Sequence, residues 1–369
     1  MTQRYDLVFI GLSLSSSWGN GHATTYRALL RGLKAEGKRV LFLERDVPWY
    51  AANRDLAVPD FCDLRLYDSV DELVSGHGET LFAARTVVVG SYVPEGRKVI
   101  DAVAAIGPTQ LCFYDIDTPV TMDLLLRGEE DCLARRQVPL FDIYFSFAGG
   151  EVLERLEREF GAQRAVALYC SVDAERHAPA ADPTPKWDLG YLGTYSDDRQ
   201  PKLEALLIEP ARRLPDMRFV VAGSQYPDDI DWPANVERIE HLPPDLHAGF
   251  YQSQRFTLNV TRADMVAAGW SPSVRLFEAA ACHTPIISDF WRGLDELLPE
   301  DEAVLIARDA GDVVTILTAL SNSHREDIAR RAAAIVRQDH TGQARARDLV
   351  AALAAPVMER RAAVAGARA

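Results

Sequence analysis

A polar loop that runs into a helix, within residues 269–289, has the residue types best suited to hold a phosphorylated ligand. Ser271 or Ser273 is expected to begin the helix, where unpaired backbone N–H groups and a partial positive charge suit a diphosphate. Arg275, one turn further along, offers a fixed cation. Glu278 lies near the same helix face, where its carboxylate can accept hydrogen bonds from ribose hydroxyls. The alternative is an exposed Arg–Glu pair worth roughly a few tenths of a kcal/mol.

A second polar segment, residues 193–202, follows the first strand of the second half of the chain. Gly193 and Thr194 begin a turn that allows the backbone to approach a ligand, and Arg199 or Lys202 supplies positive charge there. The alternative is an ordinary solvated turn, because two aspartates of the same segment stand beside these cations. The sequence leaves both interpretations open.

Asp115 and Asp117 end an apolar strand and precede Thr118–Pro119. Both carboxylates are expected at the carboxyl edge of a sheet, pointing in opposite directions because side chains alternate along a strand. A pair with this spacing can also hold Mg²⁺ on a diphosphate, but that interpretation requires a single-domain architecture. The remaining alternative is an aspartate that caps the following turn.

The loop 13–22 joins the first strand to the first helix, and its glycines permit close backbone approach. Ser17, Asn20 and His22 are candidates to hydrogen-bond a ligand, although a histidine at a helix start also serves as a cap or packing residue.

A dinucleotide site was also considered, because Glu44 and Asp46 close the second strand, where a ribose-binding acid would lie. The glycine spacing does not fit, since the third glycine of the dinucleotide fingerprint is missing. We therefore expect no NAD binding.

The elements that position these residues alternate between strand and helix. An apolar strand at 7–12, a helical pattern at 24–34 and a strand at 39–43 form a βαβ unit. Apolar, β-branched runs recur at 86–89, 110–114, 143–147 and 165–169, with helical stretches between some of them. This alternation predicts an α/β fold with mostly parallel strands.

A proline-rich stretch at 178–186 separates this series from a second one of the same kind. The second series is predicted to have strands at 189–192, 218–222, 255–259 and 285–288 and helices at 201–213, 245–252 and 273–282. We predict a first Rossmann-like domain over 1–178, a linker over 179–186, a second Rossmann-like domain over 187–345 and a C-terminal helix with a tail over 346–369. The end, Met358–Ala369, is expected to be frayed. Two such domains place the carboxyl ends of their strands at a shared crevice.

Composition sets limits on function. The chain has 369 residues and a net charge of −14, which argues against a nucleic-acid groove lined by Lys and Arg. No apolar run is long enough to span a membrane and no signal peptide is evident, so we expect a cytoplasmic protein. The five cysteines stand singly, and no metal-ligand spacing appears. We assign no metal site.

Four segments together resemble group-1 glycosyltransferases with the GT-B fold, and most closely their spore-maturation (CgeB-type) branch. These segments, within residues 110–345, are Phe113–Thr121, Leu192–Gln200, Ser273–Cys282 and His340–Thr341. The resemblance implies two Rossmann-like domains facing across a cleft, with a nucleotide-sugar on the second domain and the acceptor on the first. It also implies that Arg199 contacts the diphosphate.

The resemblance therefore predicts transfer of a hexose from a nucleoside diphosphate sugar, UDP-linked by analogy, to an unidentified acceptor. We expect no metal requirement and no further cofactor, because cationic side chains and helix amides face the diphosphate. Asp115 or Asp117 is a candidate base toward the acceptor hydroxyl if the reaction inverts the sugar configuration, and His22 lies on the acceptor side. The sequence does not identify the oligomeric state.

One departure from the family pattern concerns the sugar. The larger group has two glutamates separated by seven residues, and Trp270 stands where the first would fall, eight residues before Glu278. The ribose contact carries over to Glu278, whereas the sugar contact does not. Retention of configuration is what the broader group implies. Two rival functions stay open: a nucleotide-sugar epimerase with the same fold, and a non-catalytic nucleotide-sugar-binding protein.

Overall fold

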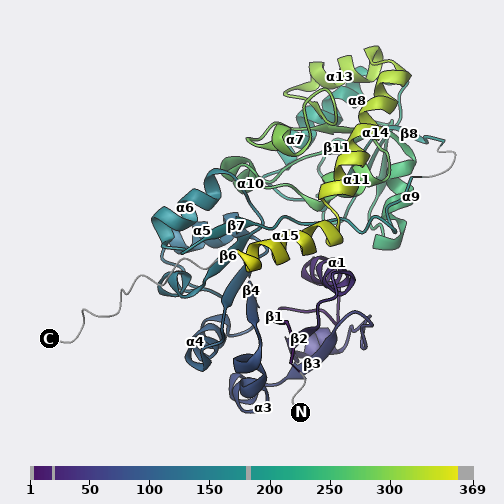
Figure 1. The fold of residues 1–369 in the computed structure, drawn as a ribbon. Helices are drawn as coiled ribbons and strands as arrows, with labels where there is room; N and C mark the ends of the chain where they lie inside the picture. Colours follow the sequence, from purple (N-terminus) through teal and green to yellow (C-terminus); the bar gives the residue numbers. More distant parts are fainter. Residues whose placement is uncertain (1–3, 19–20, 180–183, 356–369) are drawn as a thin grey trace.

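The computed structural model describes residues 4–18, 21–179 and 184–355. These residues form two α/β domains, each a parallel β-sheet covered by helices (Figure 1). The first sheet has seven strands in the order β3-β2-β1-β4-β5-β6-β7. Its strands are β1 (Leu7–Gly11), β2 (Val40–Arg45), β3 (Asp63–Tyr67), β4 (Thr86–Gly90), β5 (Leu111–Asp115), β6 (Ile143–Ser146) and β7 (Ala165–Ala167). Its helices are α1 (His22–Ala35), α2 (Pro48–Ala51), α3 (Val70–Ala83), α4 (Gly96–Ile106), α5 (Thr118–Leu126), the 3-10 turn η1 (Arg135–Leu140) and α6 (Glu151–Phe160).

The second sheet has six strands in the order β10-β9-β8-β11-β12-β13. Its strands are β8 (Trp187–Leu192), β9 (Phe219–Ala222), β10 (Val236–Ile239), β11 (Gln254–Asn259), β12 (Ile286–Ser288) and β13 (Leu305–Ile306). The connecting helices are α7 (Gln200–Leu203), η2 (Glu204–Ile208), α8 (Glu209–Arg213), η3 (Pro244–Leu246), α9 (His247–Gln252), α10 (Ala263–Ala268), α11 (Val274–Ala281), α12 (Leu294–Leu297), α13 (Ala310–Ala319) and α14 (Asn322–Asp339).

Both sheets contain strands that are buried along their whole length, as is typical of parallel sheets. Every residue of β1, β4, β5 and β9 is buried, as expected when helices cover both faces of a sheet. The strand order reverses between β1 and β4 in the first sheet and between β8 and β11 in the second. Ligands bind outside the carboxyl ends of strands at such reversals, so the fold predicts one binding region per domain.

The last helix, α15 (Gly342–Ala354), returns from the second domain to the first and packs against α1, as Figure 1 shows. Two glycines permit this close approach. A Cβ on Gly342 would lie 2.3 Å from the carbonyl oxygen of Ala28, and one on Gly32 would lie 2.4 Å from that of Gly342. Both glycines therefore allow α15 and α1 to pack with their backbones in close contact.

A backbone bond links the two crossings between the domains. The Val172 amide donates to the carbonyl of His340 (3.0 Å), and Val172 forms an isolated parallel bridge with Thr341. The His340 ring stacks on Phe277 of α11, with ring centroids 4.2 Å apart, and Arg345 donates to its Nδ1. The His340–Thr341 motif thus lies at this junction, where the Thr341 side chain also caps α15.

Several elements differ from the sequence predictions. The single helix predicted over 201–213 consists of α7, the π-helical turn η2 and α8, because Pro210 lacks the N–H that a continuous α-helix needs. The strands β3, β10 and β13 and the helix α10 had no counterpart in the prediction. Part of the predicted linker (180–183) and the predicted frayed end fall outside the described residues, and the domain boundaries stay predictions.

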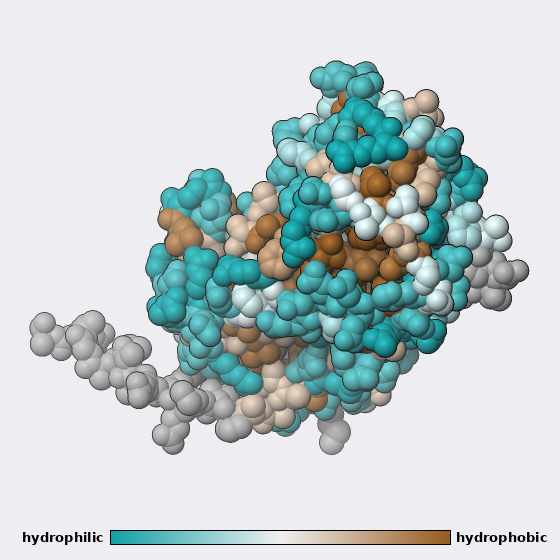
Figure 2. Space-filling model, turned by 90° about the horizontal axis from the view of Figure 1, so that it is seen from above, coloured by the Kyte–Doolittle hydropathy of each residue, from teal (hydrophilic) through white to brown (hydrophobic). Residues whose placement is uncertain are grey.

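The surface of the protein is mostly hydrophilic, as expected from its many charged residues. Figure 2 shows, from above, mostly hydrophilic side chains with apolar ones gathered in a hollow near the centre of this face. Over the described ranges, no helix is long and apolar enough to cross a membrane.

Candidate functional site

A pocket of about 430 Å³ lies at the carboxyl ends of β8 and β9 in the second domain. Five residues predicted for the nucleotide-sugar line it: Gly193, Thr194, Arg199, Arg275 and Glu278. The rest of the lining comes from Leu192, from 222–224, from the segment 240–247, from Tyr251 and from Val274. The structure therefore brings together residues from two distant predicted segments.

Arg275 is fixed by the strand ends behind it. Its Nε donates to the carbonyl of Leu192 (2.5 Å), and its Nη1 donates to Asn259 Oδ1 (3.1 Å) and to the Val260 carbonyl (3.4 Å). The guanidinium also lies over the ring of Tyr191, 5.1 Å from its centroid. A guanidinium held in this way presents positive charge to the pocket without further ordering.

Ser273 precedes α11 as predicted, but neither Ser273 nor Ser271 contacts the ligand pocket with its side chain in the predicted way. Ser273 is the N-cap residue of α11, but its hydroxyl donates to Asn259 Oδ1 (2.9 Å) and makes no capping bond to the helix. Ser271 is buried and lies outside the lining of the pocket. The amides at the start of α11 are therefore not capped by the Ser273 side chain, while Asn259, at the end of β11, orients both Ser273 and Arg275.

The turn after β8 is shaped by close backbone contacts. Gly223 has a φ of +154°, and a Cβ there would lie 2.0 Å from the carbonyl oxygen of Gly193. The Tyr226 hydroxyl donates to that same carbonyl (2.9 Å). Arg238 lies between the rings of Tyr226 and Trp232, at 4.1 and 4.4 Å from their centroids. This cluster holds the turn that carries Gly193 toward the pocket.

Of the charged residues after β8, Arg199 lines the pocket, whereas Asp198 and Lys202 contact other parts of the second domain. Arg199 donates through Nη2 to the Thr194 carbonyl (2.6 Å), and its Nε is buried without a partner among the described residues. Asp198 accepts from the amide of Ala263 (2.9 Å), at the start of α10. Lys202 lies 3.5 Å from the buried Asp289. Only Arg199 of these cations lines the pocket.

Glu278 is surrounded by three rings from two other segments, α9 and the interdomain segment that contains His177. Tyr251 donates to its Oε2 (3.1 Å), His247 Nδ1 lies 3.9 Å from the same oxygen, and His177 Nε2 lies 3.8 Å from Oε1. Its side chain retains 14% of its exposure, so the carboxylate still faces the pocket. Neither histidine was predicted as a site residue, because no spacing pattern connects them to Glu278 in the sequence.

A second pocket, of about 520 Å³, lies between the two domains and shares Pro244, His247, Val274 and Glu278 with the first. Its first-domain wall comes from Ser17, from the start of α1 and from Asp55. Polar side chains line most of it: Ser17, Thr24, Thr25, Arg27, Arg31, Asp55, Ser171, Asp173, Arg176 and Asp245. Because they share these four lining residues, the two pockets are neighbours at the domain boundary.

The loop that begins this wall is fixed by two acids, the buried Glu44 and the exposed Asp55. Both amides of Leu14 and Ser15 donate to Glu44 Oε2 (2.6 and 2.8 Å), and Glu44 is fully buried. Asp55 accepts two bonds from Ser17 and two from Arg27. Glu44 is thus occupied by the loop and has no surface to offer a ribose. Asn20, predicted beside Ser17, lies outside the described residues.

Asp115 is fully buried and lines neither pocket. Tyr144 donates to its Oδ2 (2.6 Å), and Thr121 donates to its Oδ1 (2.9 Å). Burial raises the pKa of this carboxyl to about 6, although these hydrogen bonds oppose the rise. In this arrangement Asp115 has no surface with which to touch an acceptor, and it holds the end of β5 in place.

Asp117 and His22 meet through a residue that was not predicted, Tyr92. The Tyr92 hydroxyl donates to Asp117 Oδ2 (3.2 Å), and the His22 ring packs edge-on against Tyr92 at 5.3 Å. Burial raises the pKa of Asp117 and lowers that of His22 to about 4. Tyr92 has a φ of 60°, which is uncommon for a bulky residue and typical of functional loops. Neither Asp117 nor His22 lines the two pockets.

Trp270 lies between the domains and outside the lining of both pockets. Its carbonyl accepts from the amide of Gly149 in the first domain (2.9 Å), and its indole Nε1 donates to Glu296 (2.9 Å). Arg292 lies over the indole and pairs with Glu151 across the boundary (2.7 Å). Where the larger group has a glutamate, this chain has an interdomain contact.

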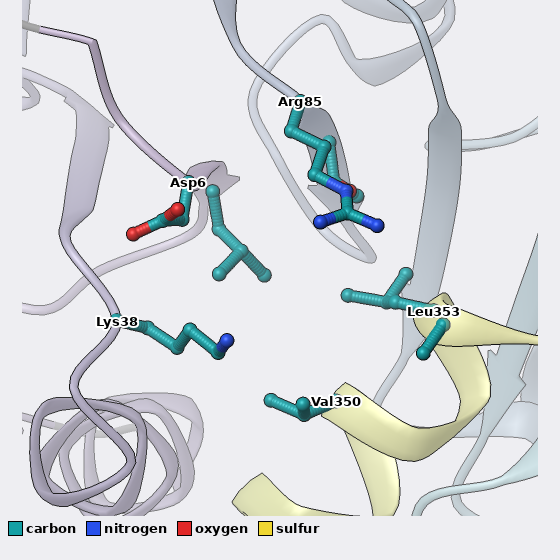
Figure 3. Close-up of a pocket in the computed structure, with 8 residues that line it drawn as sticks. Asp6, Lys38, Arg85, Val350 and Leu353 are labelled. Carbon is teal, nitrogen blue, oxygen red and sulfur yellow. The ribbon is translucent and has the colours of Figure 1, made fainter.

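A third, smaller pocket of about 90 Å³ lies at the opposite edge of the first sheet, where β1 and β4 begin. Figure 3 shows Lys38 and Arg85 beside Val350 and Leu353 of α15. Ligand sites of this architecture lie at the carboxyl ends of strands, and no predicted site residue reaches this pocket. Within the parts of the chain described, no group of three or more His, Cys, Asp or Glu side chains is arranged to hold a metal ion.

Comparison with known proteins assigns the fold. Residues 199–351 match the model of the family described as glycosyl transferase-like. A comparison with curated protein sequences finds no match. The predicted GT-B architecture is confirmed, because solved glycosyltransferase structures align over nearly the whole chain.

Three of these structures are similar to this chain in fold but share little sequence with it. Sucrose-phosphate synthase from Thermosynechococcus elongatus is 14% identical, with a TM-score of 0.64, over 94% of this chain and 100% of that one. Anabaena HepE in complex with UDP and glucose is 11% identical, with a TM-score of 0.68, over 96% and 100%. T4 phage BGT in complex with UDP-glucose is 10% identical, with a TM-score of 0.59, over 94% and 98%. The chain therefore combines a glycosyltransferase fold with a glycosyl transferase-like second domain.

Proposed function

We propose that this chain transfers a hexose from a nucleoside diphosphate sugar, UDP-linked, to an acceptor hydroxyl held between the domains. One observation carries the proposal: a pocket that gathers Arg199, Arg275 and Glu278 shares four lining residues, Glu278 among them, with a polar interdomain pocket. The UDP and UDP-glucose complexes of structures with the same fold support the choice of donor. The four sequence segments support placement in the CgeB-type branch, and the five free cysteines support a cytoplasmic location.

The donor's diphosphate is expected to lie between Arg275, Arg199 and the turn at Gly193–Thr194. Arg275 is held by carbonyls and by Asn259, so its charge needs no reorganisation when negative charge develops on the departing diphosphate. Glu278 accepts hydrogen bonds from the ribose. These groups supply the stabilisation for which other enzymes use a metal ion, and the proposed transfer is metal-independent.

The acceptor is expected in the interdomain pocket, where closure of the domains excludes water and suppresses hydrolysis of the donor. Asp117 is the base candidate for an inverting transfer, since burial raises its pKa, although the hydrogen bond from Tyr92 opposes the rise. It lines neither pocket, so this role requires that domain closure brings the acceptor hydroxyl to it. Asp115 positions this strand end, and His22 packs beside Tyr92. A retaining transfer needs no such base, so the anomeric configuration of the product decides the role of Asp117.

Binding and chemistry are tested in sequence. Thermal unfolding is measured with UDP, GDP, ADP and their sugars, since a ligand at 100 times its Kd stabilises by about 2.7 kcal/mol. We expect a UDP-dependent rise in Tm that Glu278→Ala abolishes and that the surface control Glu237→Gln retains. UDP release from UDP-hexoses is then followed with a panel of acceptors, with and without EDTA.

Two results would contradict the proposal. One is a folded protein that no nucleotide stabilises. The other is complete loss of transfer in EDTA with rescue by Mg²⁺, which would reject the metal-independent part. Incubation with UDP-N-acetylglucosamine alone separates an epimerase, which returns an intact but altered nucleotide-sugar. A non-catalytic binding protein would bind UDP and release none from any donor.

A further inference from the structure

One side of the interdomain pocket presents more cations than acids. This side is formed by the first domain and by the interdomain segment 171–177, and Figure 1 shows α1 of the first domain at the domain boundary. Its arginines are Arg27 and Arg31 of α1 and Arg176 of the segment, and its carboxylates are Asp55 and Asp173. How these five side chains pair with one another determines which charge is left for a ligand.

Arg27 and Asp55 satisfy each other. Arg27 donates through Nη1 and Nη2 to the two oxygens of Asp55 (3.0 and 2.5 Å) and through Nε to the Leu14 carbonyl (3.0 Å). Asp55 also accepts from the amide and the hydroxyl of Ser17 (3.1 and 2.6 Å). The hydrogen bonds from Arg27 hold the pKa of Asp55 well below its ordinary value. This bidentate pair is neutral as a unit and fixes the wall of the pocket.

Arg31 and Arg176 are not satisfied in this way. Arg31 lies over the Phe61 ring (4.9 Å to the centroid), and its only ion pair within the described residues is a loose one, with Nη1 3.8 Å from Asp173 Oδ2. Asp173 Oδ1 already accepts from the amides of Glu175 and Arg176 (3.2 and 3.3 Å). The Arg176 side chain is exposed and makes no ion pair or hydrogen bond with any described residue. One carboxylate therefore faces two guanidinium groups, and both have free N–H donors.

We infer that Arg31 and Arg176 bind a phosphate group on the acceptor, which makes phosphorylated sugars or polyols the acceptor class. The inference rests on the proposed function and deepens it. A phosphate monoester has three terminal oxygens, so it can accept from two guanidinium groups that approach from different segments. A carboxylate has two oxygens, which one guanidinium already matches. The hydroxyls of Thr24 and Thr25 line the same side and make no hydrogen bond within the described parts of the chain, so they can donate to the ligand as well.

The acids on the opposite side of the pocket orient such an acceptor. Asp245 and Glu278 come from the second domain, and Glu278 also lines the donor pocket. Carboxylates repel a phosphate but accept hydrogen bonds from hydroxyl groups. The phosphate is therefore expected against Arg31 and Arg176, with the hydroxyl end of the acceptor directed toward the second domain, where the donor sugar is proposed to lie. This orientation presents a hydroxyl, and not the phosphate, to the sugar that is transferred.

Isothermal titration of the full chain in saturating UDP tests the inference, because UDP then occupies the donor's diphosphate site. The titrants are inorganic phosphate, glycerol 3-phosphate and glucose 6-phosphate, with glycerol and glucose at equal ionic strength as unphosphorylated counterparts. We expect inorganic phosphate to bind, and the phosphorylated member of at least one pair to bind at least about tenfold more tightly than its counterpart. Arg31→Gln and Arg176→Gln are each expected to weaken that binding about tenfold and to keep the affinity for UDP.

Arg97→Gln is the matched control. Arg97 belongs to the same domain and lies outside both pockets, and it resembles Arg31 in side-chain exposure (50% against 51%) and in the distance of its ion pair (3.7 Å to Glu130 against 3.8 Å). The control should retain the binding of every titrant. In the release of UDP from UDP-glucose with a phosphorylated acceptor, Arg31→Gln and Arg176→Gln should raise the KM for the acceptor much more than they change kcat.

The outcomes separate this inference from the function on which it rests. A folded wild type that does not bind UDP overturns the proposed function. UDP binding without binding of any phosphorylated titrant overturns the phosphate site and leaves the donor site standing. Phosphate binding that persists in both folded glutamine variants assigns it elsewhere and also overturns the inference. Arg31→Lys or Arg176→Lys replaces a glutamine variant that does not fold, and the loss of the planar fork should still weaken binding.

Discussion

The indole of Trp270 lies directly against Gly150 of the other domain, where a Cβ on that glycine would meet the ring at 2.2 Å. The same indole lies 2.2 Å from a Cβ built on Gly293, so two glycines make room for it. Trp270→Ala is expected to destabilise the protein by about 1–3 kcal/mol, because it empties this space at the domain boundary. Urea unfolding measures the change. Trp49→Ala removes an indole that is 53% exposed and should change stability by less than about 0.5 kcal/mol. Equal effects of the two variants would contradict the role of Trp270.

Arg275 depends on the shape of its guanidinium. Arg275→Lys keeps the charge but cannot reach the Leu192 carbonyl and Asn259 together from one planar group. We expect UDP affinity to fall about tenfold, measured by isothermal titration. Arg213→Lys, an exposed residue paired with Glu209, is the matched control and should leave affinity unchanged. Unaltered binding in Arg275→Lys would remove this residue from the donor site.

Asp117 is expected to set the acid side of the pH–rate profile if the transfer inverts. Its pKa is raised by burial, and a base acts only when deprotonated, so activity should rise with pH through a value above the ordinary 3.8 of an aspartate. Asp117→Asn should lower kcat by about 100-fold or more and leave UDP affinity unchanged. Steady-state kinetics across pH check both points, and an unaltered kcat would exclude Asp117 as the base.

Asp115 should make stability depend on pH. Its pKa is about 6 in the folded protein against 3.8 as the ordinary value, so the folded state binds the proton more tightly. The resulting stabilisation is fully present below about pH 4 and is lost as pH rises through about 6, by an amount on the order of 1–3 kcal/mol. Asp115→Asn removes this titration. Urea unfolding of both proteins at about pH 5 and about pH 7.5 tests it, and parallel pH dependences would refute it.

The sequence predicted the parts of the fold that local pattern determines. Buried strands such as β1 and β5 are continuous apolar runs, and a proline-rich break separates two βαβ series, so the architecture could be inferred. The donor segments could be inferred as well, because each follows a strand end, where a parallel sheet exposes backbone. Arg199, Arg275 and Glu278 do line one pocket.

Contacts between distant segments could not be inferred in this way. His177 and His247 approach Glu278 only because the interdomain segment and α9 fold against α11, and no spacing encodes this. Asp115 and Asp117 were both predicted as candidate bases. Asp115 is fully buried, whereas Asp117 is partly exposed at the start of α5. Alternation along a strand indicates opposite directions but does not say which direction meets solvent. Asn259 was the residue that could have been found, since it ends a predicted strand beside the donor segment.

The bond between Val172 and His340 has a consequence for how the enzyme opens. The two segments that connect the domains are paired side by side at Val172 and at His340–Thr341. We expect relative movement of the domains to pivot near this pairing, because the Val172–His340 bond joins the two connections there. Because the terminal helix is anchored on α1, it travels with the first domain.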